Sequence, residues 1–381
     1  MRNFVFHNPT KYVFGKDTVK LIGQEIRNFG SKKVLLVTGR GSIKKNGVYD
    51  TVVESLKDND IDWIELWGVR PNPVLSKVKE GIKLAKEHGV DGVLAVGGGS
   101  TIDTAKTIAH GIFIDDPWEM FVDSSKTPNR ALPIYVVLTL SATGSEMNGG
   151  AVITNEETGQ KWGFGSPLAY PKVSIVDPTV QFSLPRIQTA NGGSDAISHI
   201  LEAYITGRPT DTTVYIDEGL MKSIIDNIDI LMEKPDNYEA RASFAWAATL
   251  ALNGISGRGL AGDWLSHAIE HAISAIYPDV AHGSGLAVIH PAVLLYRRKH
   301  NPDILKRWAR EVWNVDTAEA GVEKMREKYR SWGLPISLKE LGVKHTDWET
   351  IIEKTIELGW GDLWEPITYE VVEEILKYAD I

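Results

Sequence analysis

Cysteine is absent from this chain of 381 residues. A disulfide framework and thiolate catalysis are therefore excluded, and any transition-metal site has to use His, Asp and Glu. No apolar run reaches the length that a membrane-spanning helix needs, and the N-terminus MRNFVFHNPTKYVFG lacks the apolar core of a signal peptide. Basic residues do not cluster and the net charge is −9, so we expect a cytoplasmic protein with no nucleic-acid or membrane partner.

The length exceeds the usual limit for one hydrophobic core, so we expect two domains. In the first half, short apolar runs alternate with segments of helical spacing such as 47–58, 75–89 and 100–112. This alternation predicts βαβ units and a doubly wound, mostly parallel sheet. The predicted strands are KKVLLVTG (32–39), DWIELW (62–67), DGVLAVGGG (91–99), LPIYVVLTL (132–140) and YPKVSIVDP (170–178).

Strand signals stop after residues 182–193, where Ser183 as N-cap and Pro185 near the first turn predict the start of a helix. Apolar residues recur at helical spacing over 211–234, and the segment 239–256 is rich in alanine. The sequence therefore predicts an α/β dinucleotide-binding domain over 1–184 and an all-helical metal- and substrate-binding domain over 185–381.

Two glycine-bearing turns follow predicted strands. In VGGGSTIDTAK (96–106), three glycines would let an anion approach the free N–H groups of a helix start, although a plain flexible turn has the same composition. The spacing is not GxGxxG, so the ordinary Rossmann fingerprint is missing. The second turn, VTGRGSIKKNG (37–47), has no acidic residue for a ribose 2′-OH and is either basic and solvated or suited to a 2′-phosphate. A third segment, LTLSATGSEMN (138–148), has the small and hydroxyl residues that suit a backbone beneath a flat ligand.

Asp195 and His199 are four residues apart, so they share one face of a helix. His267 and His271 repeat that spacing, and His282 follows in an AHGSG segment that we expect to be a loop. Each residue alone has an ordinary explanation, such as a helix cap or a hydrogen-bonded core histidine. Together they offer one carboxylate and several imidazoles, a set that suits Fe(II), Zn(II) or another divalent metal.

In order and spacing, these motifs resemble the iron-dependent (group III) alcohol dehydrogenases, of the butanol dehydrogenase-like branch. The resemblance rests on GGGSTIDTAK, LTLSATGSEMN, ITNEETGQK, DAISHILEAY, HAIEH and AHGSG. It implies that Asp195, His199, His267 and His282 hold a divalent metal, usually Fe(II) and sometimes Zn(II). It places His271 beside the nicotinamide or substrate, where we expect it to relay a proton or to hydrogen-bond beside the metal site.

The resemblance also implies the residues around the cofactor. The diphosphate would lie on Gly98, Gly99 and Ser100 with Asp103 beside the turn, and Asn72 would lie near the adenosine. Further contacts would come from Thr139, Thr143, Asn148 and Lys161. Gly39 and Ser42 fall where the branch using NADP accepts the 2′-phosphate, whereas Arg40 replaces a frequent glycine. We therefore expect NADP(H) to be preferred over NAD(H).

The resemblance implies a metal-dependent oxidoreductase that interconverts primary alcohols and aldehydes of about butanol size. We expect a substrate pocket from residues near 149–153 and 254–264, and a homodimer formed through the N-terminal edge strand. The alternative is a dehydroquinate synthase-like or glycerol dehydrogenase-like relative acting on a polyol or phosphorylated substrate. Those relatives usually have fewer histidines in the metal set, so HAIEH argues against them.

Overall fold

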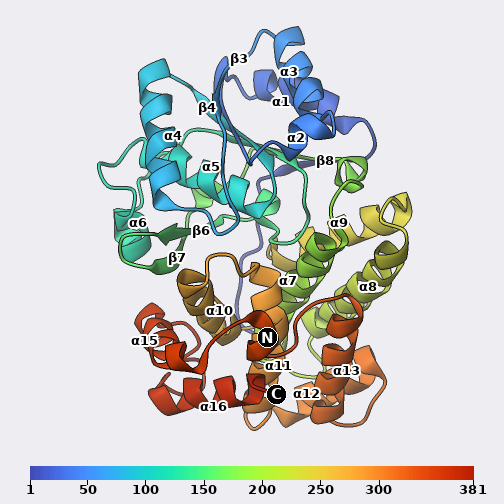
Figure 1. Cartoon of the computed structure of the whole chain (residues 1–381). Coiled ribbons are helices and arrows are strands. Elements are labelled where there is room, and N and C mark those ends of the chain that lie inside the picture. The colour runs from blue at the N-terminus through green and yellow to red at the C-terminus, as the bar shows by residue number, and fades with distance from the viewer. The chain divides into compact units, whose positions relative to one another are not determined.

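The computed structural model describes all 381 residues, and the chain divides into two compact units (Figure 1). The α/β unit comprises His7–Leu184 and Pro235–Ala245, and it contains every strand. The helical unit comprises Met1–Phe6, Pro185–Lys234 and Trp246–Ile381. No helix is both long and apolar enough to cross a membrane.

Six parallel strands form the sheet of the α/β unit, in the order β1-β8-β5-β4-β2-β3. They are β1 (Lys11–Phe14), β2 (Lys33–Thr38), β3 (Asp62–Leu66), β4 (Gly92–Gly97), β5 (Ile134–Leu138) and β8 (Val173–Val176). The central strands are apolar on both faces because helices cover both faces. In β2, Leu35 and Val37 belong to one buried cluster, and Val34 and Leu36 belong to another.

Helices α4 (Leu75–His88) and α5 (Gly99–Gly111) pack in the first cluster, while α1 (Ile22–Asn28) and α3 (Val48–Asp58) pack in the second. The predicted doubly wound, mostly parallel fold is therefore confirmed. The neighbouring strands β2, β4 and β5 are parallel, so the turns that follow them lie at one edge of the sheet. Those turns are the three segments that the sequence singled out for cofactor binding.

Short elements complete the α/β unit. The helices α2 (Ser42–Lys45) and α6 (Glu119–Val122) are one turn each, and β6 (Gly150–Asn155) pairs with β7 (Gln160–Gly165) in an antiparallel hairpin. The sequence analysis expected an N-terminal edge strand, which is β1, without giving its bounds, and it did not predict this hairpin. The hairpin turn contains Gly159 in the left-handed region, with φ of 63°. A glycine between two short strands is a recognisable hairpin signal.

The helical unit is built around α7, α10 and α11, which pack against one another. Its helices are α7 (Arg186–Tyr204), α8 (Thr212–Glu233), α10 (Leu265–Ile276), α11 (His282–Arg297), α12 (Pro302–Trp313), α13 (Ala318–Ser331), α14 (Leu338–Leu341), α15 (Trp348–Leu358) and α16 (Tyr369–Ala379), while α9 (Tyr238–Leu252) has residues in both units. Ser183 was wrongly predicted as the N-cap of the first helix. Pro185 stands at that position in an extended conformation, and the helix begins at Arg186.

Candidate metal centre and dinucleotide site

Asp195 and His199 lie one turn apart on α7, and both are buried. His199 Nε2 lies 3.5 Å from Asp195 Oδ1. The start of α11 abuts α7 so closely that a Cβ on Gly283 would lie 2.2 Å from the carbonyl oxygen of Asn191. Glycine is therefore needed at 283, and this contact brings the neighbouring His282 against Asp195.

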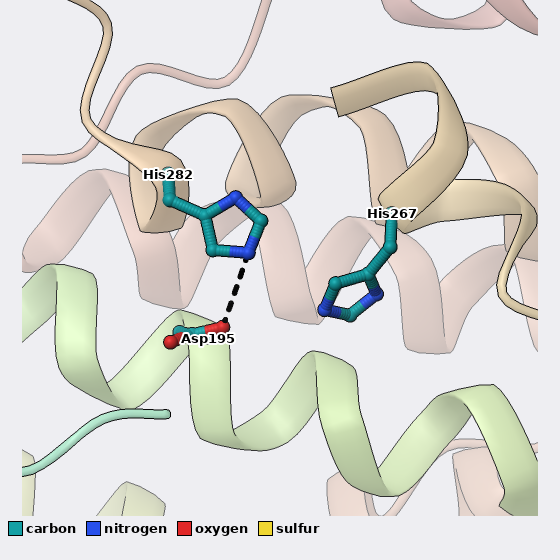
Figure 2. Close-up of side chains that lie close together, drawn as sticks. All are labelled: Asp195, His267 and His282. Atoms are coloured by element: carbon teal, nitrogen blue, oxygen red, sulfur yellow. Dashed lines mark ion pairs between the residues drawn. The ribbon is translucent and has the colours of Figure 1, made fainter. Parts of the chain in front are cut away.

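Figure 2 shows Asp195, His267 and His282 facing one another from α7, α10 and the start of α11. One ligand atom from each of these residues lies within 4.8 Å of the others, and His282 Nε2 is 3.6 Å from Asp195 Oδ1. The expectation that His282 lies in a loop was wrong, because it is the first residue of α11. Its backbone is therefore fixed by a helix of 16 residues.

His199 lies beside this group of three, with its ring stacked on that of His267 at a centroid distance of 4.9 Å. Burial lowers the pKa of His199 to about 3, so the imidazole is neutral and able to bind a metal. His271 belongs to a second grouping, with Glu270 and His282, whose ligand atoms also lie within 4.8 Å of one another. The structure thus places all five residues of the predicted cluster together.

Two carboxylates that the sequence analysis missed lie behind the imidazoles. His267 Nδ1 lies 2.7 Å from Glu202 Oε1, and His282 Nδ1 hydrogen-bonds to Glu270 Oε2. A carboxylate on Nδ1 fixes the ring and makes Nε2 a better metal donor. A repeated H-x-x-E pattern in the sequence could have identified these carboxylates. Glu202 follows His199 by three residues, and Glu270 follows His267 by three.

The donor set fits a divalent transition metal. Asp195 Oδ1 is buried and accepts no hydrogen bond within the protein, an arrangement that would be costly without a cation. The donors are imidazole nitrogens and a carboxylate oxygen, which suit Fe(II), Zn(II) and related ions.

Gly98 and Gly99 lie at the start of α5, directly after β4, and Ser100 follows in the first turn. A Cβ on Gly99 would lie 2.5 Å from the side chain of Thr143. The segment after β5 therefore packs directly onto this turn. Together they place the free N–H groups of a helix of 13 residues at the edge of the sheet.

A buried lysine, Lys106, joins α5 to the segment that carries Asn148. Its Nζ donates to Ser145 Oγ, to the carbonyl oxygens of Asn148 and Gly150, and to Asn148 Oδ1, at 2.8–3.1 Å. Asp103 Oδ1 accepts from the same Ser145 hydroxyl at 2.6 Å. Asp103 thus holds the loop beside the glycine turn, a role that the sequence analysis did not assign to it or to Lys106.

The other predicted cofactor residues occupy the same unit. Lys161 Nζ donates to Asn72 Oδ1 at 3.0 Å, so two buried residues far apart in sequence form a pair. The backbone N–H of Thr139 donates to Gly97, which joins the ends of β5 and β4. Gly39 and Ser42 lie in the same loop as Gly41, whose φ is 116°.

Lys44, which follows this loop, does not add a freely placed positive charge. Its Nζ lies 4.2 Å from the centroid of the Trp67 ring and 4.9 Å from that of Tyr49. Both rings donate hydrogen bonds to Glu65. The charge of Lys44 is thus partly balanced by an acidic neighbour, although Arg40, Lys44 and Lys45 are all exposed.

A dinucleotide-type sheet edge and a cluster of histidines hydrogen-bonded to carboxylates indicate an enzyme that binds a dinucleotide and a divalent metal. Family models for iron-containing alcohol dehydrogenase match residues 9–178, and for the C-terminal part of the Fe-containing alcohol dehydrogenase family residues 189–379. The chain belongs to the iron-containing alcohol dehydrogenase family.

Individual relatives cover the whole chain. NADH-dependent butanol dehydrogenase A of Clostridium acetobutylicum is 41% identical, over 99% of both chains. NADPH-dependent aldehyde reductase YqhD of Escherichia coli is 35% identical, over 100% of both chains. The crystal structure of NADH-dependent butanol dehydrogenase A from Thermotoga maritima matches with a TM-score of 0.96 at 47% identity, covering 100% of this chain and 99% of that one. The predicted resemblance is confirmed, and the protein is an NAD(P)-dependent enzyme that interconverts alcohols and aldehydes.

Proposed function

We propose that the enzyme interconverts linear primary alcohols and aldehydes of about butanol size with NADP(H), using a metal held by Asp195, His199, His267 and His282. The observation that carries the proposal is the convergence of a buried carboxylate and imidazoles whose Nδ1 atoms are engaged by Glu202 and Glu270. It is tested by metal analysis of the purified protein and by NADPH oxidation with butanal. A metal-free protein with full activity would refute it.

Different residues of the chain would bind the metal, orient its ligands and orient the cofactor. When bound, a divalent metal supplies Lewis acidity at the oxygen of the substrate and the nicotinamide exchanges a hydride. Asp195 and the three imidazoles would hold that metal and so would set where the substrate oxygen binds. Glu202 and Glu270 hold the rings of His267 and His282 in one tautomer, and the loop held by Lys106 orients the cofactor.

The relatives' names also bear on the substrate. The butanol dehydrogenases of Clostridium acetobutylicum and Thermotoga maritima are 41% and 47% identical to this chain. They support a short primary alcohol in preference to the polyol or phosphorylated substrate of the alternative. We also propose a homodimer through β1, which is an edge strand of the sheet.

We expect Gly39→Asp to reduce kcat/KM with NADPH about tenfold to a hundredfold. A Cβ at Gly39 would meet only the carbonyl oxygen of Val69, at 3.6 Å, so the position can accept the side chain. The new carboxylate would repel a 2′-phosphate and accept a bond from a ribose 2′-OH. Rates with NADPH and NADH, each measured with butanal, give the preference of both proteins.

The names of the relatives leave the cofactor open, because both an NADH-dependent and an NADPH-dependent enzyme are similar to this chain. The proposal of NADP(H) therefore depends on the loop alone, which has no acidic residue between Gly39 and Lys45. A wild-type preference for NADH, or an unchanged NADPH reaction in Gly39→Asp, would contradict it.

His271→Ala is expected to retain the metal and to lower kcat about tenfold to a hundredfold. His271 is buried beside His267 and His282, at ring-centroid distances of 6.4 and 5.6 Å. We propose that its ring moves a proton between the site and solvent, so added imidazole should restore part of kcat in the variant. Loss of metal without rescue would instead make His271 a ligand.

A further inference from the structure

Two half-buried tryptophans contact the histidine cluster from different segments of the helical unit. Trp264, directly before α10, lies 5.1 Å from the ring of His267 and 6.3 Å from that of His199. Trp360, two residues beyond the end of α15, lies 5.3 Å from the ring of His271. Large apolar rings beside a set of metal-binding groups restrict what a substrate can place there.

Trp264 has an unusual backbone conformation. Its φ is 64°, in the left-handed region that bulky residues rarely adopt. The conformation is held from two sides, because its N–H donates to Glu202 Oε2 at 2.7 Å and the N–H of Asp263 donates to the carbonyl oxygen of Glu202 at 2.9 Å. Strain of this kind persists where surrounding contacts enforce it, and it often marks a functional position. Glu202, which hydrogen-bonds to Nδ1 of His267, therefore also positions Trp264.

Arg297, which is fully buried on α11, connects both tryptophan-bearing segments. Its Nε and Nη2 contact the two carboxylate oxygens of Asp263 at 3.0 and 3.1 Å, next to Trp264. The same Nη2 donates to the carbonyl oxygen of Gly361 at 2.5 Å, next to Trp360. A planar guanidinium is suited to hold two such groups in fixed geometry.

Gly361 allows the segment that carries Trp360 to approach the segment that carries Trp264. Its φ is 99°, and a Cβ there would lie 2.6 Å from Cβ of Leu265, the first residue of α10. The turn that carries Trp360 thus packs onto the start of the helix that Trp264 precedes. One arginine and one helix start therefore hold both rings beside the histidines.

We propose that Trp264 and Trp360 are specificity-determining residues that limit the chain length of the alcohol or aldehyde, with Arg297 as the positioning residue for both. The inference rests on the proposed function, and it goes further by naming the residues that define the substrate class. Unbranched short chains with no polar substituent suit two apolar rings. Longer chains are disfavoured because the rings occupy the space.

The test measures chain-length selectivity in two ways in Trp264→Ala, Trp360→Ala and Arg297→Lys. The first is kcat/KM for octanal relative to butanal. The second is the Kd of hexanamide relative to butanamide, two unreactive carbonyl compounds, for the holoenzyme with reduced cofactor. We expect each tryptophan variant to shift both ratios toward the longer chain by about tenfold or more. Arg297→Lys, which keeps the charge but loses the planar fork, should shift them in the same direction with the metal retained.

Trp313→Phe is the matched control, because this half-buried tryptophan of the same unit packs on Trp308 and not on a histidine. Wild-type ratios in either tryptophan-to-alanine variant, or an equal shift in the control, would overturn the inference. A wild type that reduces neither aldehyde but distinguishes the two amides would refute the proposed function and leave the inference standing.

Discussion

Alanine in place of His267 or of His282 is expected to abolish metal binding and to lower kcat by about a thousandfold or more. Each residue contributes one of three converging donors, and Lewis-acid stabilisation amounts to several kcal/mol. Bound metal is measured by elemental analysis and turnover by NADPH oxidation with butanal. Full metal occupancy and near-normal rates in both variants would reject the ligand assignment.

Substitution of the carboxylates that hydrogen-bond to the imidazoles should lower metal affinity less than loss of an imidazole does. Glu202→Gln and Glu270→Gln keep the side-chain volume but remove the charge that engages Nδ1 of His267 and of His282. Metal affinity should fall about tenfold to a hundredfold, less than in the alanine variants. His345→Ala is the matched control, since this exposed histidine of the same unit packs on Trp348. It should bind metal like the wild type.

Lys106→Met is expected to destabilise the α/β unit by about 3–5 kcal/mol and to weaken NADPH binding. The substitution removes a buried cation that donates to Ser145, Asn148 and Gly150, and it leaves their acceptors without that donor. The loop carrying Asn148 would then lose its attachment to α5. Urea unfolding gives the stability, and fluorescence titration with NADPH gives the affinity.

The pH dependence of stability provides a specific signature for Lys106. Burial lowers its pKa from 10.5 to about 8. Between these values the unfolded chain binds more protons than the folded one, so the contribution of Lys106 to stability rises with pH. The free energy of unfolding of the wild type, minus that of Lys106→Met, should therefore increase from pH 8 to 10.5. The exposed Lys86 on α4 supplies the control, because Lys86→Met should change stability by only about 0.5 kcal/mol or less. A flat difference would show that burial does not lower the pKa of Lys106 in the folded protein.

The sequence predicted those features that depend on residues close together along the chain. Asp195 and His199 share a helix face because an α-helix repeats every 3.6 residues, and the same holds for His267 and His271. The strands of the parallel sheet were visible because strands buried on both faces are continuously apolar. The bounds of β1 were not predicted because it is a four-residue edge strand of mixed polarity. The β6–β7 hairpin was missed because its strands are only partly buried and lack the continuous apolar run of the central strands.

Contacts between distant segments were decided only by the tertiary structure. Nothing local pairs Glu202 with His267, Lys161 with Asn72, or Arg297 with both Asp263 and Gly361. The sequence by itself therefore determined the fold class, the family and the candidate donor residues, which depend on periodicity and on motif order. The packing of α7, α10 and α11 decided which carboxylate supports which imidazole and which tryptophans face the cluster. Such pairings depend on close approach of backbones, as at Gly283 and Gly361, and this is a property of the packed chain that no local pattern encodes.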